Sequence, residues 1–179
     1  MIYKTWYKSP LGKILLASDG ENIVGLWIEG QKYFFKGLRE HIVIKDDLEI
    51  FIKTKKWLDM YFSKENPLIK DLKLAPKGSD FRQNVWKILC EIPYGKTITY
   101  GDIANKIAKI MNKDKMSAQA VGNAVGHNPI SIIIPCHRVV GKDGNLTGYA
   151  GGIDKKIELL KLEGIDMKQF FIPKKGTAL

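Results

Sequence analysis

The chain has 179 residues, of which 45% are apolar and 27% charged, a balance typical of a globular protein rather than a disordered or fibrous one. A chain of this length buries roughly two thirds of its unfolded surface, so it needs neither a disulfide nor a metal to fold. The N-terminus lacks the pattern of a secretory signal, and no apolar run approaches the roughly 20 residues of a membrane span, so we expect a cytoplasmic protein.

The net charge of +10 is concentrated in the second part of the chain. Residues 76–179 carry 16 basic and 9 acidic side chains, whereas residues 1–75 carry 13 and 10. Neutralisation of phosphates by Lys and Arg provides much of the sequence-independent affinity for DNA, so this excess suggests a polyanionic partner. A lysine-rich surface that only keeps the protein in solution explains the charge equally well.

The first 75 residues predict a small lobe that contains both strands and a helix. Three short apolar runs separated by turn residues predict an antiparallel meander. They are residues 2–7, 13–17 and 23–28. Between residues 46 and 63 the apolar positions change to helical spacing, which predicts a helix that covers a core. From Pro67 to Asp80 no period is visible and Pro, Gly, Lys and Ser are frequent, so we place a domain boundary near residue 76.

Beyond this boundary the sequence predicts mainly helices. Ser79 or Asp80 can cap a helix that runs to about Ile92, where Pro93-Tyr94-Gly95 ends it. Two further short helices, near residues 97–104 and 117–126, are joined by a polar loop, which suggests a helix-turn-helix. The second of them is rich in small residues, and by composition alone close helix packing explains it better than contact with a nucleic-acid groove.

Both cysteines, Cys90 and Cys136, are interpreted as free thiols, because a reducing compartment disfavours a disulfide between the only two cysteines of a chain. Cys90 lies among apolar residues of a predicted helix, where a cysteine usually acts as a small hydrophobic side chain. Cys136 follows Pro135 and the β-prone run Ile130–Ile134. This pattern predicts a buried strand that stops pairing where the thiol emerges into a pocket.

A thiol needs a base to become a nucleophile, since an unperturbed cysteine is mostly protonated at neutral pH. His137 is adjacent to Cys136, and Glu163 is a candidate to orient its ring, as in the relay of a hydrolase triad. Neighbouring residues of a strand point in opposite directions, so contact between the two requires a turn at this point or a bridging water. By spacing alone, an inert Cys-His pair is the better interpretation.

The segment Ile134-Pro135-Cys136-His137-Arg138-Val139-Val140-Gly141 closely resembles the O6-alkylguanine-DNA alkyltransferase family. The flanking segments 126–129 and 148–152, which read Gly-His-Asn-Pro and Gly-Tyr-Ala-Gly-Gly, resemble it too. The likeness runs from about Phe81 to Gly164, while residues 1–75 match only in layout. It implies an α/β (α+β) fold, with a small ribonuclease-H-like N-terminal lobe at 1–75 and a mainly helical, winged-helix-like C-terminal lobe with a helix-turn-helix at 76–179.

The resemblance also implies a reaction. Members of the family repair DNA by moving the alkyl group of O6-alkylguanine, and of O4-alkylthymine, onto their own cysteine, once per molecule. The chain is therefore expected to be a methylated-DNA–protein-cysteine S-methyltransferase, a suicide enzyme with Cys136 as acceptor. Flipping of the damaged base out of the duplex exposes the alkyl carbon to the thiolate, and neither a metal nor another cofactor is needed. The expected partner is double-stranded DNA, bound through its minor groove by a monomer without an obligate protein partner.

The resemblance assigns roles to individual residues. His137, acting through a water, removes the thiol proton, and Glu163 supports it. Asn128 braces the turn that leads to the cysteine, and Tyr100 contacts the flipped nucleotide and can protonate the guanine ring. Residues expected to bind substrate or DNA, including backbone groups near Val139 and the pocket wall at Tyr149, are Gln119, Ala120, Gly122, Arg138, Val139, Tyr149, Ala150 and Gly151.

Two positions depart from the family pattern. Family members commonly have an arginine where this chain has Gln119, and that arginine fills the gap left by the flipped base. Glutamine is shorter and uncharged, so we expect weaker DNA binding or a different lesion preference. Ala150 stands where some relatives have serine, which leaves its backbone N–H as the donor to the alkylated oxygen.

Three alternatives stay open from the residues alone. A lesion-binding protein without transfer activity would lack the cysteine that is present here. A cysteine hydrolase acting on acyl compounds would turn over repeatedly and would not depend on DNA. A metal site would draw on residues whose spacing matches no standard zinc pattern. These residues are Cys90, Cys136, His41, His127 and His137.

The remaining charged residues have simpler interpretations. We expect His41 to face solvent and His127 to cap a helix or contact a phosphate. Four lysines of the polar loop and the helix before it either contact the DNA backbone or are merely solvated. They are Lys106, Lys109, Lys113 and Lys115.

Overall fold

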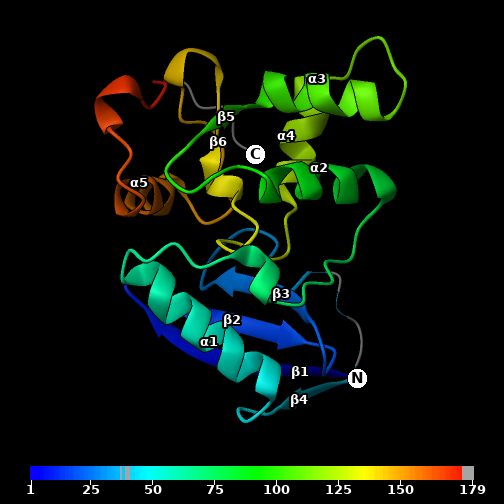
Figure 1. Ribbon diagram of the computed structural model, residues 1–179, viewed down its shortest axis with the longest axis vertical. Coiled ribbons are helices and arrows are strands. Elements are labelled where there is room, and N and C mark those ends of the chain that lie inside the picture. Colours follow the sequence, from blue (N-terminus) through cyan, green and yellow to red (C-terminus); the bar gives the residue numbers. More distant parts are fainter. Residues whose placement is uncertain (37, 39–40, 175–179) are drawn as a thin grey trace. The chain divides into compact units, whose positions relative to one another are not determined.

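In a computed structural model of the chain, residues 1–36, 38 and 41–174 are described, and the chain forms two compact units (Figure 1). The first consists of Met1–Lys77 together with Pro129–Ile133. The second consists of Gly78–Asn128 and the described residues from Ile134 onward. The chain thus leaves the first unit close to residue 76, where the sequence analysis placed a boundary, but residues 129–133 pack with the first unit rather than with the second.

A four-stranded sheet forms the centre of the first unit. The predicted antiparallel meander is confirmed as β1 (Ile2–Ser9), β2 (Gly12–Ser18) and β3 (Ile23–Ile28). A short strand, β4 (Ile42–Ile44), pairs with β1 in parallel, so the strand order is β3-β2-β1-β4. Three residues are too few to display an alternating pattern, which explains why the sequence did not predict β4.

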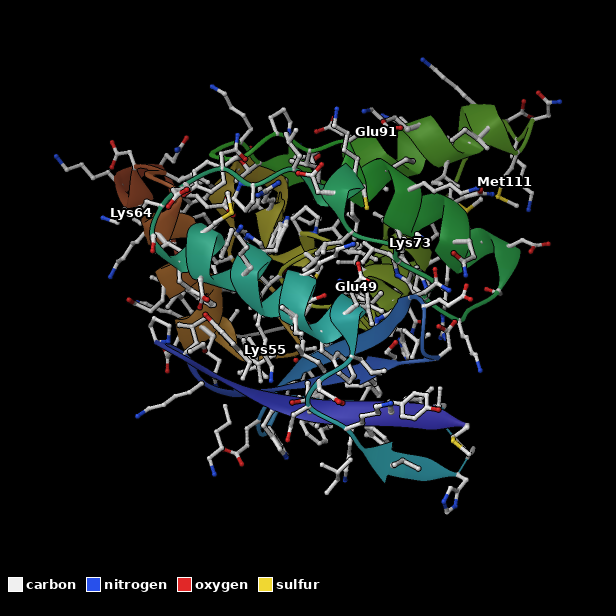
Figure 2. The ribbon with its side chains drawn as sticks, turned by 60° about the horizontal axis from the view of Figure 1, so that its bottom comes forward. Glu49, Lys55, Lys64, Lys73, Glu91 and Met111 are labelled. Atoms are coloured by element: carbon white, nitrogen blue, oxygen red, sulfur yellow. The ribbon has the colours of Figure 1, made fainter. Side chains whose placement is uncertain are left out.

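Helix α1 (Glu49–Phe62) lies across one face of this sheet (Figure 1). Its buried residues include Phe51 and Leu58, as expected of a helix that covers a core. Lys55, labelled in Figure 2, donates a hydrogen bond from the helix to Thr5 Oγ1 of β1 at 2.9 Å. The helix is therefore held on the sheet by apolar packing and by this hydrogen bond to β1.

The second unit is built from helices. The helix predicted after the boundary is confirmed as α2 (Asp80–Cys90), whose N-terminus is capped by Ser79. Helices α3 (Tyr100–Ile110) and α4 (Ala118–Gly126) follow each other and pack together and against α2, as a helix-turn-helix requires. Within the described residues, every helix is too short or too polar to cross a lipid bilayer.

Short elements complete this unit. Strands β5 (Ile98–Thr99) and β6 (Val139–Val140) pair in parallel, and helix α5 (Ile153–Leu162) follows. Single turns of 3₁₀-helix occur in both units. They are η1 (Ile69–Asp71) in the first unit and η2 (Cys136–Arg138), η3 (Lys142–Gly144) and η4 (Met167–Gln169) in the second.

The predicted strand at Ile130–Ile134 is wrong. Ile130 alone forms an isolated bridge with Leu26, and the following residues form turns. Ile132 has a φ of 71°, which a β-branched residue rarely adopts, and Ile133 N donates to Ser131 O at 2.9 Å across it. All residues of this run are buried. The apolar composition therefore reflects burial, which a sequence pattern cannot distinguish from strand pairing.

Replacement of Gly25 by alanine tests the packing of the sheet. The new Cβ would lie 1.9 Å from the ring of Trp27, which is buried and packs against Phe34 and Phe35. We expect the free energy of unfolding to fall by about 1–3 kcal/mol, as for other overpacked cores, in urea denaturation. Gly101→Ala is the control, because its nearest neighbour lies 3.7 Å from the added Cβ. Equal stability of the two variants would contradict this packing.

Candidate active site

Cys136 opens the 3₁₀ turn η2, so it and His137 do not alternate across a strand. Pro135 has φ −80° and ψ 63°, and the N–H of Cys136 donates to Ile134 O at 2.8 Å. The side chains of Cys136 and His137 are buried. The turn that a Cys-His contact requires is therefore present, although in a different form from the expected strand end.

The side chain of Asn128 stabilises this turn by a hydrogen bond to its backbone. It follows His127, the C-cap of α4, and its Nδ2 donates to Ile134 O at 2.8 Å. The residue is only 4% exposed. One amide side chain therefore ties the end of α4 to the backbone two residues before Cys136, which is the bracing contact expected for Asn128.

Glu163, the C-cap of α5, is the most heavily bonded side chain of the site. Its Oε1 accepts from His137 Nε2 at 2.6 Å and from Arg138 Nη2 at 3.0 Å. Its Oε2 accepts from Arg138 Nε at 2.9 Å and from the backbone N–H of Gly95 at 3.0 Å. Burial alone would raise the pKa of Glu163, but these hydrogen-bond donors and the positive charge of Arg138 hold that pKa well below its usual range.

The charge of Glu163 determines how His137 is protonated. An ionised carboxylate can only accept, so His137 Nε2 carries a proton and Nδ1 has the lone pair of the neutral ring. Burial lowers the pKa of His137, the charges of Arg138 and Lys156 lower it further, and together these effects exceed the opposing attraction of Glu163. The imidazole is therefore neutral and able to accept a proton.

The thiol of Cys136 is also neutral at rest. Burial raises its pKa, and this effect outweighs a hydrogen bond from Asn128, the positive charge of Lys156 and backbone N–H groups, all of which favour the thiolate. A neutral thiol beside a neutral imidazole can exchange a proton without a change in net charge. The arrangement is thus suited to form a thiolate only when a reaction partner is in place.

Lys156 is a member of the site that the sequence analysis missed. Its side chain is completely buried, and Nζ donates to Val139 O at 2.6 Å and to Thr147 O at 2.9 Å. Burial lowers its pKa to about 8, against the attraction of a Cys136 thiolate. A signal was available, because Lys156 interrupts the apolar stripe formed by Ile153, Ile157 and Leu160.

Two tyrosines lie near the sulfur. The Tyr100 hydroxyl is 3.4 Å from the carbonyl oxygens of both Thr147 and Gly148, and the Tyr149 hydroxyl has no hydrogen-bond partner among the residues that the structure describes. Burial, followed by repulsion from a Cys136 thiolate, raises the pKa of both. Both hydroxyls therefore remain protonated and can donate.

Other predicted site residues lie in different surroundings. Gln119 is exposed in the first turn of α4, and Ala120 beside it is half-buried. Gly122 is buried, and a Cβ there would lie 3.8 Å from the ring of Tyr100, so it packs against that tyrosine.

Val139 is buried too, although its carbonyl oxygen has a second lone pair besides the one that Lys156 uses. Ala150 and Gly151 are half-buried in the loop before α5.

Arg138, for which substrate or DNA contact is expected, has a side chain that is only 7% exposed and is bonded to Glu163. Its Nη1 donates to Ile92 O at 2.6 Å, and its guanidinium lies 5.7 Å from the centre of the Tyr94 ring. A short motif does not reveal that residues 92, 94 and 163 surround this arginine.

The remaining candidates are dispersed. His41 is exposed, and His127 places Nδ1 2.8 Å from the carbonyl oxygen of Asn123, as a residue at a helix end does. The four lysines at 106, 109, 113 and 115 are exposed. In the described part of the chain, no three His, Cys, Asp or Glu side chains come together to hold a metal ion.

Two family models match this chain and together span nearly all of it. The model described as the 6-O-methylguanine DNA methyltransferase ribonuclease-like domain matches residues 2–76. The model described as the 6-O-methylguanine DNA methyltransferase DNA binding domain matches residues 80–165.

Similar proteins from distant organisms agree with the models. A methylated-DNA--protein-cysteine methyltransferase of Haemophilus influenzae is 43% identical, over 92% of this chain and 87% of its own. One from Methanosarcina acetivorans is 45% identical, over 91% of this chain and 99% of its own. A crystal structure of Mycobacterium tuberculosis OGT in complex with DNA has a TM-score of 0.79 at 39% identity and covers 94% of both chains.

Lys156→Met is expected to slow the reaction of Cys136 with iodoacetamide at neutral pH. The variant lacks a buried charge that favours the thiolate, and loss of one such charge lowers the thiolate fraction by about tenfold. Peptide mass spectrometry distinguishes Cys136 from Cys90. Lys161→Met is the matched control, because it removes an exposed lysine, with 55% of its side chain accessible, from the same helix. Equal rates in the parent protein and Lys156→Met would show that this lysine does not act on the sulfur.

Proposed function

The chain belongs to the 6-O-methylguanine DNA methyltransferase family, and from this premise we propose that Cys136 is the sulfur that receives the alkyl group. The protein repairs DNA by direct reversal, in which an alkyl group passes from O6-alkylguanine to a cysteine of the protein, once per molecule. The observation that carries the assignment to Cys136 is its burial beside a neutral His137 whose Nε2 proton is bonded to Glu163. O4-alkylthymine is included in the proposal as a second substrate.

Transfer begins when a flipped base places its alkyl carbon against the sulfur. Nδ1 of His137, through a bridging water, takes the thiol proton, and Glu163 stabilises the imidazolium that forms. The sulfur–carbon bond forms as the carbon–oxygen bond breaks, and the electron pair of the broken bond remains on the guanine. Fixing the sulfur on a rigid turn, close to the carbon and in line with the leaving oxygen, supplies much of the acceleration.

Tyr100 assists the departure of the guanine. Its hydroxyl remains protonated and lies at the backbone of residues 147 and 148, beside the loop that carries Tyr149. A hydrogen bond or proton from Tyr100 to the ring makes the leaving oxygen less basic. If Tyr100 gives up its proton, the proton that His137 took from the thiol returns to Tyr100, so that in total one proton passes from the thiol to the restored guanine. The thioether that remains on Cys136 is a poor leaving group, so the protein is consumed.

DNA binding is assigned to the helix-turn-helix of α3 and α4. Its polar loop and outer faces carry exposed lysines, and the N-terminal turn of α4 presents Gln119. We assign this surface to the minor groove of duplex DNA that contains alkylated bases, bound by a monomer. The proposal includes a cytoplasmic location, where a reducing environment keeps Cys136 free.

Cys136→Ser is expected to abolish alkyl transfer while leaving DNA binding within a few-fold of the parent protein, because the change replaces one buried atom. Intact-mass measurement after incubation with duplex containing O6-methylguanine should show one added methyl group per parent chain and none on the variant. Cys90→Ser is the matched control and should transfer normally, since burial raises the pKa of Cys90 to about 11. Methylation of Cys136→Ser would move the chemistry to another residue.

Gln119→Arg tests the effect of having glutamine in α4 where family members commonly have an arginine. The added cation should steepen the dependence of log affinity on log salt concentration by about one, the effect of one further phosphate contact, and should accelerate transfer from duplex DNA. Gln169→Arg, which adds the same charge on η4, controls for net charge alone. If both variants change affinity equally, position 119 has no special contact with DNA.

A further inference from the structure

Arg138 is held rigidly although it sits at the centre of a reactive site. Two of its nitrogens bond the two oxygens of Glu163, at 2.9 and 3.0 Å, and a third bonds Ile92 O at 2.6 Å. The ring of Tyr94 lies over the guanidinium, and the Tyr94 hydroxyl donates to Leu162 O at 3.3 Å. The chain thus keeps a permanent positive charge at a fixed point beside the His137–Glu163 pair.

A histidine and a glutamate that are buried together create a problem for a proton acceptor. The side chains of His137 and Glu163 are both 0% exposed, and their contact is 2.6 Å long. In such surroundings an uncompensated carboxylate strongly favours the imidazolium, because solvent does not screen the pair. An imidazolium has no lone pair with which to accept the proton of a thiol.

We propose that Arg138 is a positioning residue that keeps His137 a neutral imidazole with its proton on Nε2, by neutralising Glu163 and by opposing positive charge on the ring. The inference rests on the role of His137 as the base of the proposed function. It assigns to Arg138 a task that acts through His137 and requires no contact with DNA.

The titratable and charged groups that face His137 favour this interpretation. Its own turn contributes Cys136 and Arg138, and α5 with its C-cap contributes Lys156 and Glu163. Burial lowers the pKa of His137, Glu163 raises it, and both Arg138 and Lys156 lower it again. Removal of Arg138 therefore raises the pKa of His137, since one opposing cation and the neutraliser of the carboxylate are lost together.

Arg138→Met and Arg138→Lys test the proposal in the full chain without DNA. Nitrogen-15 NMR of His137 should show the neutral Nε2–H form in the parent protein at about pH 6, whereas Arg138→Met should show imidazolium there. Arg138→Lys retains the charge without the bidentate contact to Glu163, and we expect its fraction of imidazolium to lie between those of the parent protein and Arg138→Met. This variant also keeps the test decisive if the methionine variant does not fold.

The rate of methyl transfer separates positioning from a structural defect. Arg138→Met should transfer about tenfold more slowly than the parent protein at about pH 6, and the deficit should shrink towards about pH 8.5, where His137 loses its extra proton. A merely structural role would lower the rate by the same factor at every pH. Lys161→Met, which removes an exposed positive charge near the end of α5, is the control and should have the pH profile of the parent protein.

The outcomes distinguish this inference from the proposed function. A neutral His137 in both Arg138 variants at about pH 6, with rate deficits that do not change with pH, overturns the role of Arg138. A parent protein that has a neutral His137 but transfers no methyl group to Cys136 instead overturns the proposed function, whatever the state of the variants.

Discussion

The four hydrogen bonds that converge on the carboxylate of Glu163 are the constraint on which the second unit's site depends. They come from the 3₁₀ turn that carries Cys136 and from the turn at Gly95, so the end of α5, residues 92–95 and residues 136–138 must meet. A buried carboxylate is tolerated only when its oxygens are fully bonded and its charge is compensated. The arrangement that stabilises this charge is also the one that sets the protonation of His137.

The surroundings of Cys136 keep its thiol protonated, and therefore weakly reactive, in the absence of a substrate. Burial makes Cys136 a neutral thiol, while Asn128 and Lys156 reduce the energy required to ionise it. A residue that reacts only once is wasted by any stray electrophile, and a neutral buried thiol reacts slowly with small molecules in solution. Reactivity that appears only when an alkylated base occupies the site is therefore consistent with single use.

Lys156 and Arg138 show how buried cations serve as structural parts of such a site. Each is held by backbone carbonyls, Val139 and Thr147 for the lysine and Ile92 for the arginine. Lys156 favours the thiolate of Cys136, and both cations oppose a positive charge on His137. Two positive charges held at fixed points therefore favour the ionised thiol and the neutral imidazole together.

The sequence by itself predicted most of the local elements and indicated Cys136 as the candidate nucleophile. Short apolar runs split by turn residues predicted β1 to β3, and helical spacing and caps predicted α1 and α2. The segment around Cys136 indicated alkyl transfer by its resemblance to a family. Each of these signals lies within a short stretch of chain. Only the tertiary structure decided that residues 131–134 turn rather than pair, and that Arg138 and Lys156 are buried. The physical reason is the same in these cases: strand pairing and the burial of a charge depend on partners supplied by distant segments, and no local pattern records which segments meet.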